Sequence, residues 1–341
     1  MHVLVTGNLG YIGPVVVETL HAAGHRVTGW DTDFFYGCDL FPLPKPDNQV
    51  FRDVRGICPE DLDGIDGIVH LAALSNDPLG ALDPKITESI NHLATVRLAR
   101  IAKSIGIPRF VFASSCSIYG FSESGWVAET DAVNPLTEYA ESKAQSEIEL
   151  VELMDDSFTP VMLRNATAYG LSARMRFDLV LNNLVGCAVT SGKLRIMSDG
   201  TPWRPMIHIR DIAKACLMAL EAPKHSVAGQ ILNVGSEDQN HQVNSIASAA
   251  SKAVADAQVL YTGEHGADSR SYRVAFKRIY EAIPGFACDW DIERGAEEIR
   301  DGMLRSNIRE QDFVSSRFTR LHRLQELLGA GELDDQLYWR R

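Results

Sequence analysis

The sequence lacks the long apolar run that a membrane-spanning helix needs, because none of its hydrophobic segments reaches about 18 residues. Its six cysteines are scattered, with no Cys-x-x-Cys pair and no Cys/His cluster at metal-binding spacing. We therefore expect reduced thiols, as in a cytosolic protein, and no metal site. Internal repeats and low-complexity segments are also missing, and 341 residues are long enough for one large core with a smaller lobe.

Positive charge is scarce as well, since 33 lysines and arginines stand against 45 aspartates and glutamates, for a net charge of −12. This balance argues against a general binder of nucleic acid or of anionic membranes. It leaves room for an anionic small ligand held by a few local arginines. The chain opens on a strand-forming run, so we expect no secretory leader and a cytoplasmic location.

A glycine-rich loop follows the first β-rich run, His2 to Thr6, and precedes an apolar periodic segment. Its glycines are Gly7, Gly10 and Gly13. Glycines permit a tight turn and close backbone approach, and the N-terminus of the next helix offers N–H groups to a pyrophosphate. A second β-rich run ends at Asp31, whose carboxylate can accept hydrogen bonds from an adenosine ribose and would repel a 2′-phosphate. No Lys or Arg follows before Lys45, so the sequence favours NAD over NADP.

Beyond Asp31 the chain keeps alternating between β-rich runs and helical segments. The expected strands are 67–73, 109–113 and 159–164, and the expected helices are 83–105, 138–153 and 177–185. Alternation of this kind predicts an α/β fold with a doubly wound parallel sheet, whose ligand lies at the carboxyl ends of the strands.

Tyr139 and Lys143 stand four residues apart in the predicted helix 138–153, so a phenol and an ammonium share one helix face. A free phenol has a pKa of about 10, and a neighbouring cation lowers that pKa because it favours the phenolate. Ser115 follows a predicted strand and can face the same crevice. Alone, such a pair is more often ordinary surface helix and such a serine a turn residue. Beside the glycine loop, the three residues favour a catalytic site.

Assembled, these segments resemble the extended short-chain dehydrogenase/reductase family, and within it the NAD-dependent nucleotide-sugar epimerase/dehydratase group of the UDP-galactose 4-epimerase type. The resemblance covers roughly residues 1–300 and implies a Rossmann-type fold with a smaller C-terminal α/β lobe for the substrate. It rests on Thr6-Gly-Asn-Leu-Gly-Tyr-Ile-Gly13, Asp31, Asp53 within Phe51-Arg-Asp-Val54, His70-Leu-Ala-Ala73, Ser114-Ser-Cys-Ser-Ile-Tyr-Gly120, Tyr139 with Lys143, Leu163-Arg-Asn-Ala-Thr-Ala-Tyr-Gly170, and Asp199-Gly-Thr-Pro-Trp-Arg-Pro-Met-Ile-His208.

The resemblance implies that NAD is the cofactor and assigns residues to it and to the reaction. The implied cofactor-binding residues are Gly7, Leu9, Gly10, Tyr11, Ile12, Gly13, Asp31, Asp53, Val54, Leu71, Ala72, Ala73, Ser75, Tyr139 and Lys143. Tyr139 matches the catalytic base, Lys143 the residue that holds the nicotinamide ribose, and Ser115 the residue that hydrogen-bonds the reacting sugar hydroxyl. The implied reaction oxidises the sugar at C4, after which the bound 4-keto sugar is re-reduced, loses water or loses carbon dioxide.

Departures from the family pattern narrow this choice. The 4,6-dehydratases carry Asp-Glu directly after the catalytic Ser/Thr, where this chain has Cys116 and Ser117, which counts against ordinary 4,6-dehydration. Cys116 is either a further catalytic residue that transfers a proton or a small buried filler. We therefore expect an epimerase. A dehydratase, decarboxylase or reductase of the same fold is the alternative, and a non-catalytic NAD-sensing protein is a distant one.

The sequence also predicts how the chain is divided. A cofactor part spans 1–170, with a segment around 205–235 returning to it, followed by a substrate lobe at 171–309 and a helical tail at 310–341. Residues expected to contact a nucleotide-diphosphate sugar are Ser115, Thr167, Asn182, Asn183, Arg204 and Arg270. Thr167 stands where many relatives have a substrate-contacting Asn, Arg204 matches the arginine on the diphosphate, and His208 is expected to be structural. The tail contains an amphipathic helix around 318–328, which docks either onto the body or onto a second copy of an expected homodimer.

Overall fold

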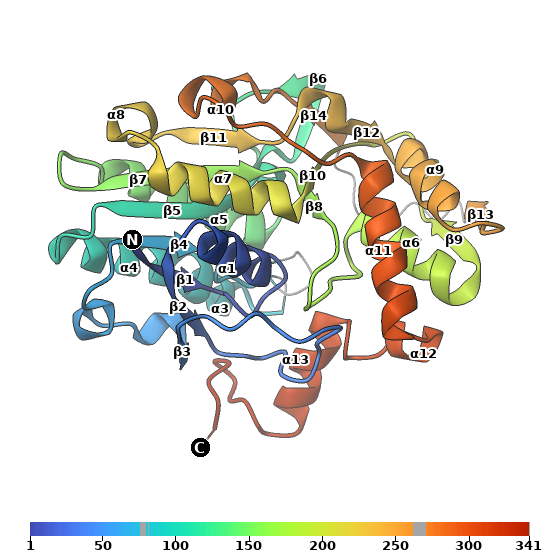
Figure 1. Cartoon of the computed structure of the whole chain (residues 1–341), viewed down its shortest axis with the longest axis horizontal. Helices are drawn as coiled ribbons and strands as arrows, with labels where there is room; N and C mark the ends of the chain where they lie inside the picture. Colours follow the sequence, from blue (N-terminus) through green and yellow to red (C-terminus); the bar gives the residue numbers. More distant parts are fainter. Residues whose placement is uncertain (76–79, 81, 262–270, 341) are drawn as a thin grey trace.

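Seven parallel strands form the central sheet of the computed structural model, which describes residues 1–75, 80, 82–261 and 271–340 (Figure 1). The order across the sheet is β11-β7-β5-β4-β1-β2-β3. In that order the strands span Ile231–Val234, Thr159–Asn165, Arg109–Ser115, Gly67–His70, His2–Thr6, Arg26–Asp31 and Asn48–Phe51. The predicted Rossmann-type α/β fold is confirmed.

The direction in which the sheet grows reverses at β1. From β1 the chain adds β2 and β3 on one side, and later β4, β5, β7 and β11 on the other. In a doubly wound sheet the connections diverge at such a point and leave a crevice outside the carboxyl ends of the strands. Here that crevice lies at the ends of β1 and β4.

Alternate residues of the strands supply two hydrophobic cores, one on each face of the sheet. Val3 and Val5 of β1 belong to one core, and Leu4 between them belongs to the other. The first face is covered by α1 (Gly13–Ala22) and α7 (Ile209–Glu221), which lie in front of the sheet in Figure 1, and the second by α4 (Ala94–Ser104) and α5 (Glu138–Glu152). Burial on both faces explains why β1, β4, β5 and β7 are nearly continuous apolar runs.

The segment predicted as one helix at 83–105 is divided into three parts. A short α3 (Pro84–Thr87) leads into a π-helical stretch (Glu88–Leu93) and then into α4. The strand predicted at 67–73 also ends earlier, at His70, because the chain leaves the sheet there to line the crevice.

The remaining elements form a lobe beside the sheet, in which α6 (Val180–Ser191), α9 (Val243–Ala253) and α11 (Ile292–Ser306) pack on one another. Its strands are β9 (Lys193–Ile196) with β13 (Gln258–Tyr261), β8 (Thr167–Tyr169) with β10 (Trp203–His208) and β12 (Asn240–Gln242), and β6 (Phe121–Val127) with β14 (Ser271–Val274). Short helices α8 (Lys224–Val227) and α10 (Lys277–Ala282) connect neighbouring elements. Helix α6 begins three residues later than the predicted start at 177, because Leu179 is extended, with φ −86° and ψ 136°.

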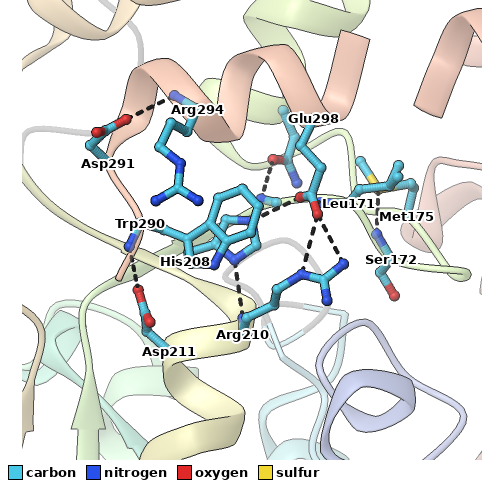
Figure 2. A network of polar contacts seen from close by, with 12 residues as sticks. Leu171, Ser172, Met175, His208, Arg210, Asp211, Trp290, Asp291, Arg294 and Glu298 are labelled. Atoms are coloured by element: carbon cyan, nitrogen blue, oxygen red, sulfur yellow. Dashed lines mark hydrogen bonds and ion pairs between the residues drawn. The ribbon is translucent and has the colours of Figure 1, made fainter. Parts of the chain in front are cut away.

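A buried polar network ties α11 to β10 and to the loop after β8 (Figure 2). The carboxylate of Glu298 accepts hydrogen bonds from Nε2 of His208 at 2.8 Å and from the N–H of Leu171 at 2.9 Å. The Nδ1 atom of His208 accepts from the N–H of Arg210, and its ring stacks on Trp290 with centroids 4.1 Å apart. His208, which the sequence predicted to be structural, is thus fully buried within this network.

The tail contains α12 (Glu310–Phe313) and α13 (Arg320–Gly329) and packs against its own chain. Leu324, Leu327, Leu333 and Leu337 are buried in the core that also holds α4. In Figure 1, α13 lies beside the loop that follows β2. Of the two arrangements that the sequence left open, the structure therefore shows docking onto the body. None of the helices in the described part combines the length and apolar character that crossing a bilayer requires.

Candidate active site

One cavity of about 1320 Å³ lies at the carboxyl ends of β1, β2, β4 and β5 and continues into the lobe. Its lining includes every predicted cofactor and catalytic residue: Gly7, Leu9, Gly10, Tyr11, Ile12, Gly13, Asp31, Asp53, Val54, Leu71, Ala72, Ala73, Ser75, Ser115, Cys116, Tyr139 and Lys143. The structure thus gathers residues from the first 143 positions around a single space, as parallel strands that end at one edge require.

The glycine loop is packed too tightly for any larger residue. Gly7 adopts φ +72°, and a Cβ there would lie 2.7 Å from the backbone nitrogen of Ala72. A Cβ on Gly13 would lie 2.4 Å from the carbonyl oxygen of Gly7. The loop, the start of α1 and the segment after β4 therefore interlock, which places the first turn of α1 at the cavity wall.

At the far end of the cavity, Asp31 is held by backbone groups. Its two carboxylate oxygens accept hydrogen bonds from the N–H of Leu9 at 3.1 Å and of Asp33 at 2.8 Å. Burial raises the pKa of Asp31, and these two hydrogen bonds oppose that shift. Asp53 forms a two-pronged ion pair with Arg55, with Nε and Nη2 of the arginine 2.9 and 2.8 Å from its oxygens. Both carboxylates are thus fixed in orientation before any ligand binds.

The predicted catalytic set lies where β5 meets α5. Lys143 is 2% exposed, and its Nζ donates to the carbonyl oxygen of Ala113 at 2.7 Å and stands 5.9 Å from the centre of the Tyr139 ring. Burial lowers the pKa of Lys143 to about 7, while the carboxylate of Glu147 acts in the opposite direction. Ser115 ends β5, and its Oγ accepts from the N–H of Ser117 at 3.1 Å. Phenol, ammonium and hydroxyl thus line one wall of the cavity.

The π-helical stretch supports this set through Asn91. The side chain of Asn91 accepts from the N–H of Leu74 and donates to its carbonyl oxygen, and it also donates to Oγ of Ser142. The same hydroxyl donates to the carbonyl oxygen of Tyr139. One buried amide therefore connects the cofactor loop after β4 to the helix of Tyr139 and Lys143. A π-bulge at a functional site is a recurrent feature of helices.

Cys116 lines the cavity, but its thiol is turned into the protein. The side chain is 1% exposed, and Sγ donates to the carbonyl oxygen of Arg164 at 3.1 Å. Burial raises the pKa of this thiol far above its usual value, so it stays protonated. Of the two interpretations that the sequence allowed, this geometry supports a buried filler.

Two polar atoms next to Cys116 were missed by the sequence analysis. Oγ of Ser117 and Oδ1 of Asn165 are buried in the cavity lining and have no hydrogen-bond partner among the residues that the structure describes. Buried polar atoms are normally paired, so these two are available to a ligand. Asn165 lies on β7, and only the strand pairing of β7 with β5 brings it beside Ser115.

The predicted substrate residues separate into three groups. The first group lines the cavity. Thr167 on β8, Asn183 on α6 and Arg204 on β10 lie on its lobe side, and Ser115 on β5 lies on the opposite side. Asn182 does not line it: its amide donates to the hydroxyl of Tyr11 and to the carbonyl oxygen of Arg176, and it is fully buried. The structure therefore gives Asn182 a packing role, because α6 turns that face toward the glycine loop. Arg270 lies outside the described residues.

Four arginines that the sequence analysis did not assign to the site add positive charge to the cavity wall. They are Arg52, Arg176, Arg195 and Arg320. Arg176 pairs with Asp178 at 2.6 Å and donates to the carbonyl oxygen of Ser75 at 3.1 Å. The segment Ala173-Arg-Met-Arg-Phe177 carries two arginines in a loop and could have signalled this site, whereas no motif marks Arg320 in the tail.

A doubly wound parallel sheet with a glycine loop at its switch point and a Ser/Tyr/Lys set beside it defines the extended short-chain dehydrogenase/reductase class. The model of the NAD dependent epimerase/dehydratase family matches residues 3–235, and the chain belongs to that family. NAD is its cofactor.

Known proteins of this family resemble the chain over most of its length. The UDP-glucose 4-epimerase of Mycolicibacterium smegmatis is 30% identical over 253 residues, which cover 69% of this chain and 77% of the relative. The UDP-glucuronic acid 4-epimerase of Bacillus cereus, solved with UDP-glucuronic acid and NAD, superimposes with a TM-score of 0.77 at 23% identity, covering 89% of this chain and 99% of that one. An NAD-dependent NDP-hexosamine 5,6-dehydratase of tunicamycin biosynthesis reaches a TM-score of 0.78 at 21% identity, covering 89% and 98%.

The residues in the cavity fit NAD. Helix α1 has no side-chain cap and no acidic residue in its first turn, so the positive end of its dipole meets no carboxylate of its own and suits an anion. Asp31 stands at the end of β2 for the ribose hydroxyls, and Nη2 of Arg320 is a buried donor with no partner in the described part of the chain. Donors for a pyrophosphate and an acceptor for a ribose are therefore both in place.

Proposed function

We propose that this enzyme epimerises nucleotide-diphosphate sugars through transient oxidation at C4. The supporting observation is that Ser115, Tyr139 and Lys143 line the same cavity as the glycine loop and as Arg204 of the lobe. Pockets for a single small ligand run to about 1,000 Å³. The larger volume of this cavity suits a dinucleotide and a nucleotide sugar lying end to end.

In the proposed reaction, Tyr139 acts as its phenolate and removes the proton from the C4 hydroxyl. NAD, when bound, supplies the acceptor of the C4 hydride and returns that hydride in the second half of the reaction. Oγ of Ser115 hydrogen-bonds the C4 oxygen, and the Lys143 ammonium beside the Tyr139 ring favours the phenolate. Tyr139 then gives the proton back to the re-formed alkoxide, so the enzyme ends each turnover unchanged.

The lobe holds the rest of the substrate while the sugar turns. Arg204 and Arg195 bring two guanidinium groups to the lobe side of the cavity, where a diphosphate needs cations and forked donors. Inversion requires the 4-keto sugar to present its other face before the hydride returns. A diphosphate held at the lobe permits that rotation, because the bonds between phosphate and sugar stay free.

The surroundings of Cys116 favour epimerisation over 4,6-dehydration. Elimination of water needs an acid and a base beside the sugar, and dehydratases of the resembled group carry Asp-Glu at these positions. Here the first position is Cys116, whose protonated thiol donates to the carbonyl oxygen of Arg164. The second position is Ser117, which offers a hydroxyl. Neither is a base near neutral pH.

The predicted homodimer is also kept as a proposal, which light scattering of the purified protein tests.

The test is to incubate purified protein with a panel of nucleotide sugars without added NAD and to analyse the products by chromatography and mass spectrometry. We expect an isomer of unchanged mass from at least one substrate. Loss of the mass of water or of carbon dioxide would instead show a dehydratase or a decarboxylase. In the matched control, Tyr139→Phe should lower turnover by about 10²- to 10⁴-fold while bound NAD is retained. Unchanged turnover would remove Tyr139 from the mechanism.

A further inference from the structure

We propose that the C-terminal tail is part of the cofactor site and that Arg320 binds the pyrophosphate of the dinucleotide. The tail lies beyond the matched family region, which ends at residue 235, and the resemblance found in the sequence ends near residue 300. Nothing in the family assignment therefore requires a tail residue in the cavity, yet Arg320 of α13 lines it.

The guanidinium of Arg320 lacks the partners that a shielded cation needs. Nη2 is buried without a hydrogen-bond partner among the described residues, and Nη1 reaches only Oγ of Ser75, at 3.5 Å. The group lies 4.5 Å from the centre of the Phe35 ring and forms no ion pair with any carboxylate in the described chain. Removing a charge from water without a counter-ion is costly, so this geometry calls for an anionic ligand.

The position of Arg320 identifies the anion. Within the described residues its one hydrogen-bond neighbour is Ser75, which lies in the loop after β4 and also accepts from Arg176. That loop packs against the glycine loop at the switch point, where the first turn of α1 carries the positive end of the helix dipole and no acidic residue. Arg176 is already paired with Asp178 at 2.6 Å, whereas Arg320 has no ion pair within the part of the chain that the structure describes. A pyrophosphate between α1 and Ser75 would supply the missing negative charge.

The ionisation of Arg320 agrees with this assignment. Burial lowers the pKa of Arg320 to about 9, the neighbouring Arg176 adds to the shift, and the carboxylates of Asp178 and Asp31 oppose it only in part. Two guanidinium groups that repel each other across one serine are stabilised together when a dianion lies between them.

The tail is anchored at the adenosine end of the same cavity. Nε1 of Trp339 donates to the carbonyl oxygen of Thr32 at 2.7 Å, and its ring lies 6.1 Å from that of Phe34. The guanidinium of Arg55, which also holds Asp53, stacks 3.8 Å from the centre of the Tyr338 ring. The tail thus contacts the cavity wall both at Arg320 and next to Asp53. A dinucleotide in the cavity would be held by the tail along this stretch.

The test is to measure ligand affinities of Arg320→Gln by calorimetry on protein freed of bound nucleotide, with Arg309→Gln as the control. Arg309 stands directly before the tail, is exposed and pairs with Asp312 at 3.2 Å. We expect ADP-ribose and NAD to bind Arg320→Gln about 10- to 100-fold more weakly than wild type, as for loss of a charge-assisted hydrogen bond. Adenosine, which lacks the pyrophosphate, and UDP, which represents the substrate diphosphate, should bind as they do to wild type. Arg309→Gln should match wild type for all four ligands.

Three results would overturn the proposal. They are unchanged ADP-ribose affinity, an equal loss for adenosine, and a loss confined to UDP, which would move Arg320 to the substrate site. A measurement on wild-type protein covers the case in which Arg320→Gln does not fold. There, NAD should slow amide hydrogen exchange across residues 320–329, and unchanged exchange in α13 would contradict a tail contact with the cofactor.

Discussion

The ionisation of single side chains in this enzyme depends on burial as much as on the chemistry of each group. Lys143 and Cys116 both line the cavity, but desolvation pushes each toward its neutral form. For Cys116 the neutral form ends any role as a base. For Lys143 it brings the pKa to about 7, so a ligand that adds negative charge nearby decides how much ammonium faces Tyr139.

Lys143 gives a prediction about stability and pH. Its pKa falls from 10.5 in the unfolded chain to about 7 in the folded protein, so the unfolded chain holds the extra proton between these values. The burial cost is therefore fully present below pH 7 and is relieved as the pH rises toward 10.5. We expect Lys143→Met to raise the free energy of unfolding above that of wild type, and this gain should be about 2–4 kcal/mol larger at pH 6 than at pH 10.

Urea unfolding of both proteins at the two pH values, without NAD, measures this difference. The exposed Lys85 supplies the control, since Lys85→Met should show no comparable dependence on pH. Equal effects of Lys143→Met at pH 6 and pH 10 would contradict the lowered pKa.

At the scale of elements, function depends on how closely the glycine loop, α1 and the segment after β4 interlock. Helix α1 begins with Gly13 and Pro14, and its first turn carries no acidic residue. Proline fits a first helical turn because its missing N–H would have no intrahelical partner there. The order of strand, glycine loop and helix predicted this loop, because the three glycines are needed for backbone reasons that any such loop shares.

Gly13→Ala tests the interlock. The added Cβ would lie 2.4 Å from the carbonyl oxygen of Gly7, and backbone must move to accept it. We expect a stability loss of about 1–3 kcal/mol, as for overpacking a close contact, together with weaker NAD binding. Gly56→Ala is the control, because its Cβ would meet only Nη2 of Arg52, at 4.0 Å. Thermal unfolding and NAD titration of both variants give the comparison, and equal behaviour would show that the loop yields easily.

At the scale of the whole molecule, the sheet and the lobe are joined through buried polar contacts. The carboxylate of Glu298 on α11 accepts hydrogen bonds from the N–H of Leu171 and the ring of His208, and it pairs with the guanidinium of Arg210. This junction helps to hold the lobe, with Arg204 and Arg195, on the cavity that Tyr139 also lines. The division into a cofactor part, a substrate lobe and a tail remains a prediction about what each part binds.

Glu298→Gln tests the junction. Burial raises the pKa of Glu298, but hydrogen bonds from His208 and Leu171 outweigh that effect, so the net pKa lies below the usual value. Its stabilisation is thus present above about pH 4.5 and is lost as the pH falls through the folded pKa. We expect Glu298→Gln to cost about 1–3 kcal/mol at pH 7 and less at pH 4. Denaturant unfolding at both pH values measures this, with the exposed neighbour in Glu297→Gln as control; a constant difference would argue against an ionised Glu298.

The sequence by itself determined the fold, the cofactor and the positions of Ser115, Tyr139 and Lys143. These depend on short-range rules: a parallel sheet from alternating segments, a glycine loop from spacing, and a shared helix face from a four-residue separation. Only the tertiary structure decided which side of α6 meets the cavity, so that Asn183 lines it and Asn182 packs on Tyr11. It also decided that the Cys116 thiol is shielded and that Arg320, 177 positions after Lys143, lies in the same cavity. Burial and contacts between distant segments arise from packing, and no local pattern in the chain encodes them.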